Sequence, residues 1–207
     1  YRFELLTGLI TSAGGLTESL VRHSSTCLIE YMDSLPIEGS VGCSLTSLFE
    51  TLVDIFAKYL RQERVTLPLL DVLGLLYESG TLLNVTDEKL HLKLFLQTKK
   101  ETFKSKNIRK ILSSIKVYTG LASLDIVGVR VKALQQLLAY LVHSFPRIRI
   151  EASDQLYTLL SVAEEDYTEA MDIITSTDWA QPLDIIKTER DKLYTLLDIP
   201  KPILVKK

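Results

Sequence analysis

The sequence predicts an all-α protein of helical hairpin repeats, of the HEAT or armadillo type that stacks into a short α-solenoid. Leucine supplies 38 of the 207 residues, and leucine loses little rotamer freedom in a helix. Apolar residues recur at spacings of three and four along most of the chain, which is the period of one helix face. No segment has the alternation of a convincing strand.

Two helices are predicted before Pro36. The first covers Tyr1–Ser12 and is broken by Gly14 and Gly15. Thr17 is the predicted N-cap of the second helix, because a threonine oxygen can accept a hydrogen bond from the first turn. Pro36 follows the end of that helix.

Two further helices follow the loop that contains Gly39 and Gly42. An amphipathic stripe of strong regularity predicts a helix over Leu45–Leu60. The next helix starts near Pro68 and stops at Gly80. It is apolar on nearly all sides, so we expect it to be central.

Six more helices complete the predicted fold. Thr86, followed by two acids that favour a helix N-terminus, opens the first of them. Ser105 is the predicted N-cap of the next. The last four follow Gly128, and their expected positions are Val131–Leu141, from Pro146 onward, Glu165–Ile174 and Pro182–Leu197.

A short pattern of an apolar, a basic and, after two residues, a small side chain recurs three times. Its copies are Val21-Arg22-x-x-Ser25, Val129-Arg130-x-x-Ala133 and Ile148-Arg149-x-x-Ala152. In helical-pair repeats the small residue lets two helices approach and the basic residue lies near an aspartate or a carbonyl. Such a pattern also arises by chance in amphipathic helices, but a helix-pair spacing of roughly 40 residues favours repeats over a simple bundle.

Bulk composition excludes several function classes. A formal charge of −2 argues against general nucleic-acid binding, which needs many phosphate-neutralising cations. Cys27 and Cys43 make no disulfide framework or zinc spacing, which favours a cytoplasmic setting. No apolar run approaches the roughly 18 residues of a membrane span. Because the chain begins without methionine, we expect residues 1–207 to form one helical-repeat domain from a larger scaffold protein.

No motif in the chain predicts catalysis, a cofactor or a metal. The Gly14-Gly15 turn lacks the lysine of a P-loop and follows a helix rather than a strand. His23, His91 and His143 are far apart, and His23 with Cys27 gives only two ligands where zinc needs three or four. We therefore expect a protein that is not an enzyme.

Charge is unevenly distributed along the chain. Residues 99–110 contain six basic residues and one acid, whereas residues 151–184 contain nine acids and no basic residue. Two solvated helix faces would explain both segments. The alternative is a polarised surface that steers a charged partner.

One run stands out as specific, GGLTESLVRHS at residues 14–24. Further runs lie at residues 28–32, 64–70, 104–108, 145–157, 178–179 and 196–204. In sequence and in order these runs resemble the C-terminal domain of the tubulin-folding cofactor D family of tubulin chaperones. The sequence departs most around Gly39 and over Asp125–Gly128, which affects loop lengths.

The resemblance implies a HEAT-like array that carries no catalytic residues. The family captures β-tubulin, joins α-tubulin through cofactor E, and works with cofactor C and an Arf-like small GTPase. The assembly makes and dissociates tubulin heterodimers and stimulates GTP hydrolysis by tubulin, and any arginine finger is expected from cofactor C. Cytoplasmic localisation with cytoskeletal association follows.

The candidate protein-interaction residues come from the specific run and from the basic segment. They are Glu18, Arg22, His23, Lys99, Lys100, Lys104, Lys106, Arg109 and Lys110. Because tubulin subunits are acidic, the basic segment is suited to such a partner. A helix hairpin retained for packing also explains the run at residues 14–24. A HEAT-type adaptor unrelated to tubulin and an all-α enzyme are the alternative functions.

Overall fold

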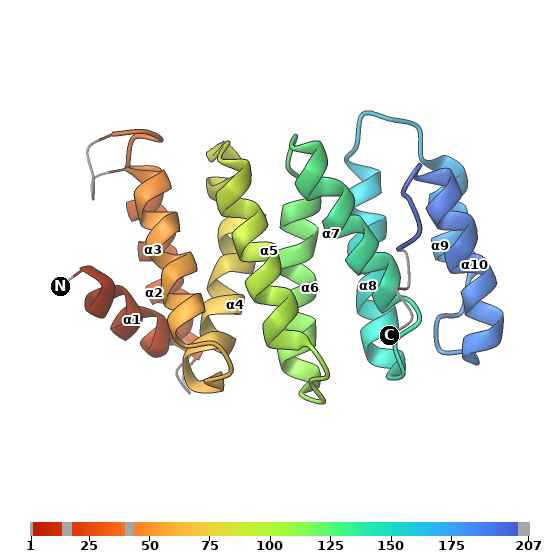
Figure 1. Ribbon diagram of the computed structural model, residues 1–207, viewed down its shortest axis with the longest axis horizontal. Coiled ribbons are helices and arrows are strands. Elements are labelled where there is room, and N and C mark those ends of the chain that lie inside the picture. Colours follow the sequence, from red (N-terminus) through yellow and green to blue (C-terminus); the bar gives the residue numbers. More distant parts are fainter. Residues whose placement is uncertain (1, 14–17, 40–43, 203–207) are drawn as a thin grey trace. The chain divides into compact units, whose positions relative to one another are not determined.

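A computed structural model gives the fold and describes residues 2–13, 18–39 and 44–202, with side chains over 3–12, 26–39 and 44–202. These residues contain ten α-helices, one 3-10 helix and no strand (Figure 1). The all-helical fold class is confirmed, whereas the HEAT or armadillo repeat type stays a prediction. The elements are α1 (Arg2–Ala13), α2 (Glu18–Asp33), α3 (Leu45–Lys58), α4 (Glu63–Glu78), η1 (Thr81–Asn84), α5 (Glu88–Thr102), α6 (Ile108–Ala122), α7 (Val127–Tyr140), α8 (Pro146–Ser161), α9 (Thr168–Ser176) and α10 (Leu183–Leu196).

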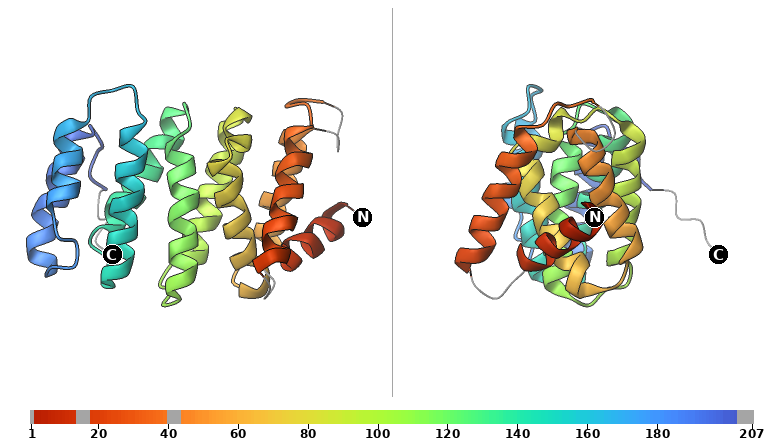
Figure 2. Two further views of the ribbon diagram at one scale, coloured as in Figure 1. Left: turned by 180° about the vertical axis from the view of Figure 1, so that it is seen from behind. Right: turned by 90° about the vertical axis from the view of Figure 1, so that its left-hand side faces the viewer.

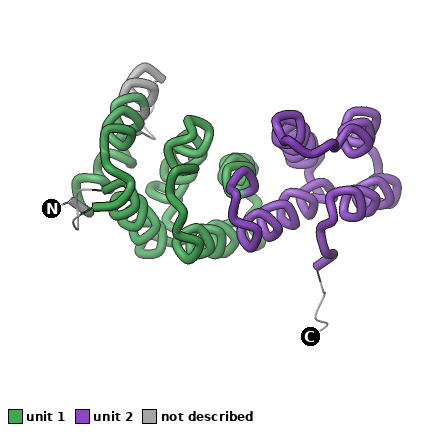
Figure 3. Tube along the Cα trace, turned by 90° about the horizontal axis from the view of Figure 1, so that it is seen from above, with its two compact units in different colours: residues 1–121 green, residues 122–207 purple. Residues whose placement is uncertain are grey.

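The chain divides into two compact units, residues 1–121 and 122–207 (Figure 3). In the first unit, α2 and α4 lie in one layer and α3 packs beside α5 in the other (Figure 2). Helix α1 packs against α2, α3 and α4. In the second unit, α7, α8, α9 and α10 pack in succession, and α10 returns to contact α7. The expectation of a single domain over residues 1–207 stays a prediction.

Helix α4 is central to the first unit, as its apolar sequence predicts. Ten of its sixteen residues are buried, and it contacts α1, α2, α3 and η1. The helix starts at Glu63 rather than near Pro68, so the proline lies inside it. An internal proline removes one helix hydrogen bond at a cost of about 3 kcal/mol. Burial of several leucines, each contributing roughly 1.5–3 kcal/mol, outweighs that cost.

A buried polar pair joins α4 to α5 within this core. The Tyr77 hydroxyl lies 2.8 Å from Nδ1 of His91, and Nε2 of His91 lies 2.8 Å from the Val85 carbonyl oxygen. Because a carbonyl only accepts, Nε2 carries the proton and Nδ1 accepts from Tyr77. Burial lowers the pKa of His91 and raises that of Tyr77, so both side chains are neutral.

Helix starts differ from the sequence prediction by a few residues. Asp87, not Thr86, caps α5, because its carboxylate accepts from the Leu90 amide at 3.1 Å. Asn107, not Ser105, accepts from the first turn of α6. Helix α7 begins at Val127 rather than Val131; because Val127 is 74 % exposed, it does not belong to the buried apolar stripe of the helix. Helix α9 begins at Thr168 rather than Glu165, and the predicted cap Thr17 lies outside the described residues.

The recurring apolar-basic-small pattern has a packing role in the second unit. Its apolar and small positions are fully buried at Val129, Ala133, Ile148 and Ala152. Arg149 is buried and donates to backbone carbonyls, as the repeat pattern predicts. The side chains of the copy at Val21–Ser25 lie outside the described part of the chain.

No described helix is both long enough and apolar enough to cross a membrane.

Candidate functional site

The basic segment forms the turn between α5 and α6. Lys104 adopts a left-handed backbone conformation, with φ 56°, and reverses the chain after α5. The Asn107 amide donates to the Ser105 hydroxyl at 3.2 Å, and the Asn107 side chain accepts from the Lys110 amide at 3.2 Å. These bonds fix where α6 begins, because they satisfy donors that a helix N-terminus leaves unpaired.

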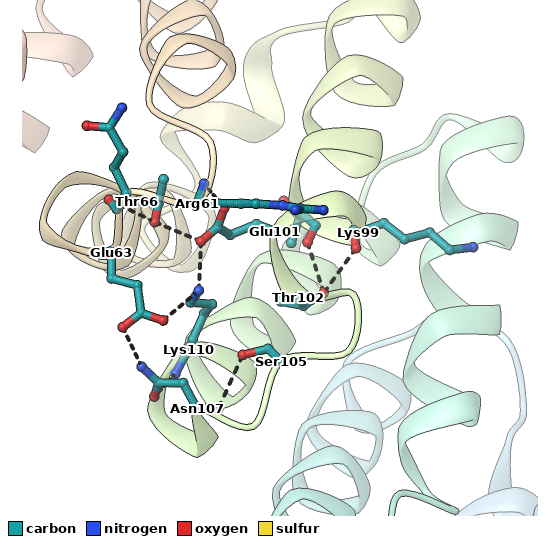
Figure 4. Close-up of polar contacts among 11 residues, drawn as sticks. Arg61, Glu63, Thr66, Lys99, Glu101, Thr102, Ser105, Asn107 and Lys110 are labelled. Atoms are coloured by element: carbon teal, nitrogen blue, oxygen red, sulfur yellow. Dashed lines mark hydrogen bonds and ion pairs between the residues drawn. The ribbon is translucent and has the colours of Figure 1, made fainter.

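A buried ion pair lies beneath this turn (Figure 4). The Glu101 side chain is 0 % exposed and the Lys110 side chain is 6 % exposed, and their charged atoms lie 2.8 Å apart. Glu101 also accepts from the Arg61 backbone amide at 2.5 Å and from the Thr66 hydroxyl at 3.0 Å. Lys110 makes a second ion pair of 2.8 Å with the half-exposed Glu63. The network therefore joins the α3–α4 turn, α4, α5 and α6.

The electrostatics of the network favour its charged form. Burial opposes the charge on Lys110, but hydrogen bonds to Glu101 and Glu63 outweigh it and raise the pKa of Lys110. The hydrogen bond from Lys110 lowers the pKa of Glu63. Arg61, whose amide the Glu101 carboxylate holds, has φ 68°. By accepting a hydrogen bond from this amide, the carboxylate stabilises a left-handed backbone conformation that residues other than glycine rarely adopt.

Five of the six basic residues of the segment lie exposed around the turn. They are Lys99, Lys100, Lys104, Lys106 and Arg109. Figure 4 shows Lys99 pointing away from the buried network. Arg109 lies 3.4 Å from Asp71 on α4, at the outer distance of an exposed ion pair. Lys110, which the charge pattern places in the same group, is instead buried.

Phe103 is an exposed aromatic side chain at the C-terminal end of α5, within the basic segment. It is 65 % exposed, and the Lys104 ammonium lies 5.3 Å from its ring centroid. Sequence reasoning missed Phe103, and it also missed Glu101 as the anchor of the turn. The signal for Glu101 was its position as the one acid in a run of six cations. We define the basic turn as Lys99, Lys100, Phe103, Lys104, Lys106 and Arg109.

The remaining candidate residues lie on α2, and the acidic segment lies in the second unit. Glu18, Arg22 and His23 belong to α2, and their side chains lie outside the described residues. The acidic segment lies in the second unit on α8, α9, the start of α10 and the two loops that connect these helices. Eight of its nine acids are exposed, and Glu151 is half-buried.

The histidines do not form a metal centre in the described part of the chain. Groups of three or more potential ligands do not occur there. His91 is occupied by Tyr77 and Val85. Burial, with a smaller contribution from Arg149, lowers the pKa of His143, and its Nδ1 accepts from the Phe145 amide at 3.1 Å.

Comparison with known families identifies the family of the chain. A family model described as tubulin folding cofactor D C terminal matches residues 1–110 of the 207. The matched range contains the whole basic turn and the buried ion pair below it. No solved structure matches the chain.

Proposed function

The chain belongs to the tubulin folding cofactor D C-terminal family, and from that premise we propose that it is a non-catalytic helical scaffold that helps a tubulin chaperone bind β-tubulin. In this role it assists assembly or dissociation of the α/β-tubulin heterodimer. Tubulin-folding cofactors E and C and an Arf-like small GTPase are the proposed further partners. The proposed setting is the cytoplasm, in association with the cytoskeleton.

The observation that carries this proposal is the basic turn. Five exposed cations and an exposed phenylalanine lie within residues 99–109, and a buried ion pair beneath the turn joins α5 to α6. Interfaces draw most of their affinity from a few aromatic or arginine anchors within a polar rim. Phe103 would be such an anchor, and Lys104, whose ammonium lies 5.3 Å from the Phe103 ring centroid, would belong to the polar rim.

The charge of the turn favours an acidic partner, and tubulin subunits are acidic. Cations on the rim orient an approaching acidic surface and raise the association rate more than the final affinity. Exposed charges are screened beyond about 8 Å at physiological salt, so binding should weaken as salt increases. Glu18, Arg22 and His23 are proposed as a second contact region on α2.

The proposal is tested by a pulldown of β-tubulin with the immobilised chain. In the test variant, Lys99, Lys100, Lys104 and Lys106 are changed to glutamine. We expect a loss of affinity between about fourfold and several hundredfold, since each of the four exposed pairs contributes about 0.2–1 kcal/mol. The matched control changes four other exposed lysines to glutamine, namely Lys89, Lys116, Lys132 and Lys187.

Both variants lose the same formal charge, so general electrostatics affects them equally. Binding that falls only in the test variant supports the basic turn as the contact. Equal binding by both variants and the unaltered chain would show that the turn does not contact β-tubulin. The same assay with Arg22 and His23 changed to alanine tests the second contact region.

A further inference from the structure

A cleft opens between α8 and α9 in the second unit, outside the residues that match the family model. Its volume is about 500 Å³, within the roughly 300–1,000 Å³ of ligand pockets. Its lining comes from α8, from the C-terminal half of α9 and from the residues that directly follow α9. We call this the α8–α9 cleft.

The floor of the α8–α9 cleft is fixed by internal hydrogen bonds. Trp179 is 4 % exposed, and its indole nitrogen donates to the Ile174 carbonyl at 2.9 Å. Arg149 donates to the carbonyls of Trp179, Ala180 and Gln181 at 2.6, 3.0 and 3.1 Å. The backbone at the end of the cleft is therefore held in place before any ligand arrives.

Four of the five hydroxyl groups in the cleft lining, all except that of Tyr157, direct their protons into the protein. Each donates to a carbonyl of the preceding helical turn: Ser153 to Ile150 at 2.7 Å, Thr158 to Asp154 at 2.9 Å, Thr175 to Met171 at 2.9 Å and Thr177 to Ile173 at 2.6 Å. A hydroxyl has one proton and two lone pairs. These groups therefore offer a ligand acceptor oxygens rather than donors.

Two carboxylates add negative charge to the same lining. Asp154 and Asp178 are exposed, and no ion pair joins either of them to a cation within the described residues. One oxygen of Asp178 accepts from the Ala180 amide at 2.9 Å, which leaves the other oxygen for a ligand. Ile150 and Tyr157 are each 43 % exposed and give the cleft an apolar and an aromatic surface.

We propose that the α8–α9 cleft binds an arginine-containing segment of a partner protein. A lining in which acceptors outnumber donors favours a ligand that brings donors, and guanidinium carries five of them with a permanent charge. Guanidinium also stacks on aromatic rings, which Tyr157 offers, more readily than an ammonium does. The exposed Ile150 calls for an apolar neighbour of the arginine, and so for a peptide rather than a free amine. This inference is independent of the proposed tubulin contact, because it concerns a different unit and the opposite charge.

The test selects a library of random heptapeptides for binding to the 207-residue chain. Enriched peptides should contain arginine beside an apolar residue. They should bind the Asp154→Asn/Asp178→Asn variant about twofold to thirtyfold more weakly, since each of two exposed pairs contributes about 0.2–1 kcal/mol. Asparagine retains the acceptor that receives the Ala180 amide, so the turn is preserved.

The matched control is Asp172→Asn/Asp184→Asn, which removes the same charge from the acidic segment without altering the cleft lining. Selected peptides should bind this control like the unaltered chain, and replacing their arginine with citrulline should abolish binding. Enrichment without arginine, or equal weakening by both double variants, would overturn the proposal. A failure to enrich any peptide would also overturn it. None of these three results bears on β-tubulin binding.

Discussion

Replacing Glu101 with alanine is expected to lower the free energy of unfolding of the first unit by about 3–5 kcal/mol. The carboxylate is fully buried and accepts from Lys110, the Arg61 amide and the Thr66 hydroxyl. Its removal leaves a nearly buried ammonium whose remaining ion partner is the half-exposed Glu63. It also removes the acceptor of the Arg61 amide at a left-handed residue.

The size of this effect follows from the separate contacts. A hydrogen bond to a charged acceptor contributes about 1.5–3 kcal/mol, and Glu101 accepts one from the Arg61 amide. Separating a buried ion pair adds to this, although Glu63 retains part of the interaction with Lys110. Glu101→Gln keeps acceptor oxygens but loses the charge, so its effect should be about half as large. In combination with Lys110→Met, the two effects should fall short of additivity by about 1–3 kcal/mol.

Urea unfolding followed by far-ultraviolet circular dichroism measures these differences. Glu78→Ala is the control, since Glu78 is an exposed acid at the end of α4 in the same unit. Surface changes of this kind usually alter stability by less than about 0.5 kcal/mol. If Glu101→Ala unfolds at the same urea concentration as Glu78→Ala, the ion pair does not hold the basic turn as we describe.

Three further predictions concern other buried groups. Because burial lowers the pKa of His91, stability is fully present above its unfolded pKa of about 6.5 and is lost as pH falls through the lowered folded value. The non-titrating His91→Gln should therefore have a flatter dependence of urea midpoint on pH. Gly120→Ala should destabilise the first unit by about 1–3 kcal/mol, because the added methyl group would overlap the buried side chain of Tyr77. Gly8→Ala should stabilise the same unit by about 0.5–1 kcal/mol, because open space surrounds Gly8 within its helix. Arg149→Lys should destabilise the second unit by about 2–4 kcal/mol, because lysine has three donors for five carbonyl contacts; fluorescence of the single tryptophan, Trp179, follows this transition.

Each of these predictions has a clear contradicting result. An unchanged pH dependence in His91→Gln would mean that this imidazole is not held neutral. A higher thermal unfolding midpoint for Gly120→Ala than for Gly8→Ala would contradict the close approach of α4 and α6. A Trp179 transition that does not move in Arg149→Lys would mean that carbonyl binding by the guanidinium is dispensable.

The sequence predicted the helices well because each buries a long apolar stripe. Leu45–Leu60 and the all-apolar stretch after Pro68 signal one amphipathic and one central helix through residue spacing alone. Helix starts were less accurate. Helix α7 starts at the exposed Val127, so its first turn does not belong to the apolar stripe from which the sequence predicts a helix. Helix α4 continues through Pro68 because burial of its apolar side chains outweighs the cost of a proline within a helix.

The candidate site was predicted only in part, because linear charge does not reveal burial. Six cations within residues 99–110 look alike in the sequence, yet Lys110 turns inward to Glu101 while Lys99 points outward. That distinction depends on helix packing across the turn. Phe103 carries no sequence signal of exposure, since a phenylalanine between two helices is more often buried.

The measurement that tests the basic turn most directly is zero-length carbodiimide crosslinking of the chain to tubulin, followed by mass spectrometry. This reagent joins an amine to a carboxylate in direct contact, which is the proposed pairing. The account predicts crosslinks from Lys99, Lys100, Lys104 and Lys106 to acidic residues of β-tubulin, and their loss at high salt. Crosslinks that arise equally from Lys89, Lys116, Lys132 and Lys187, or from these alone, would contradict it.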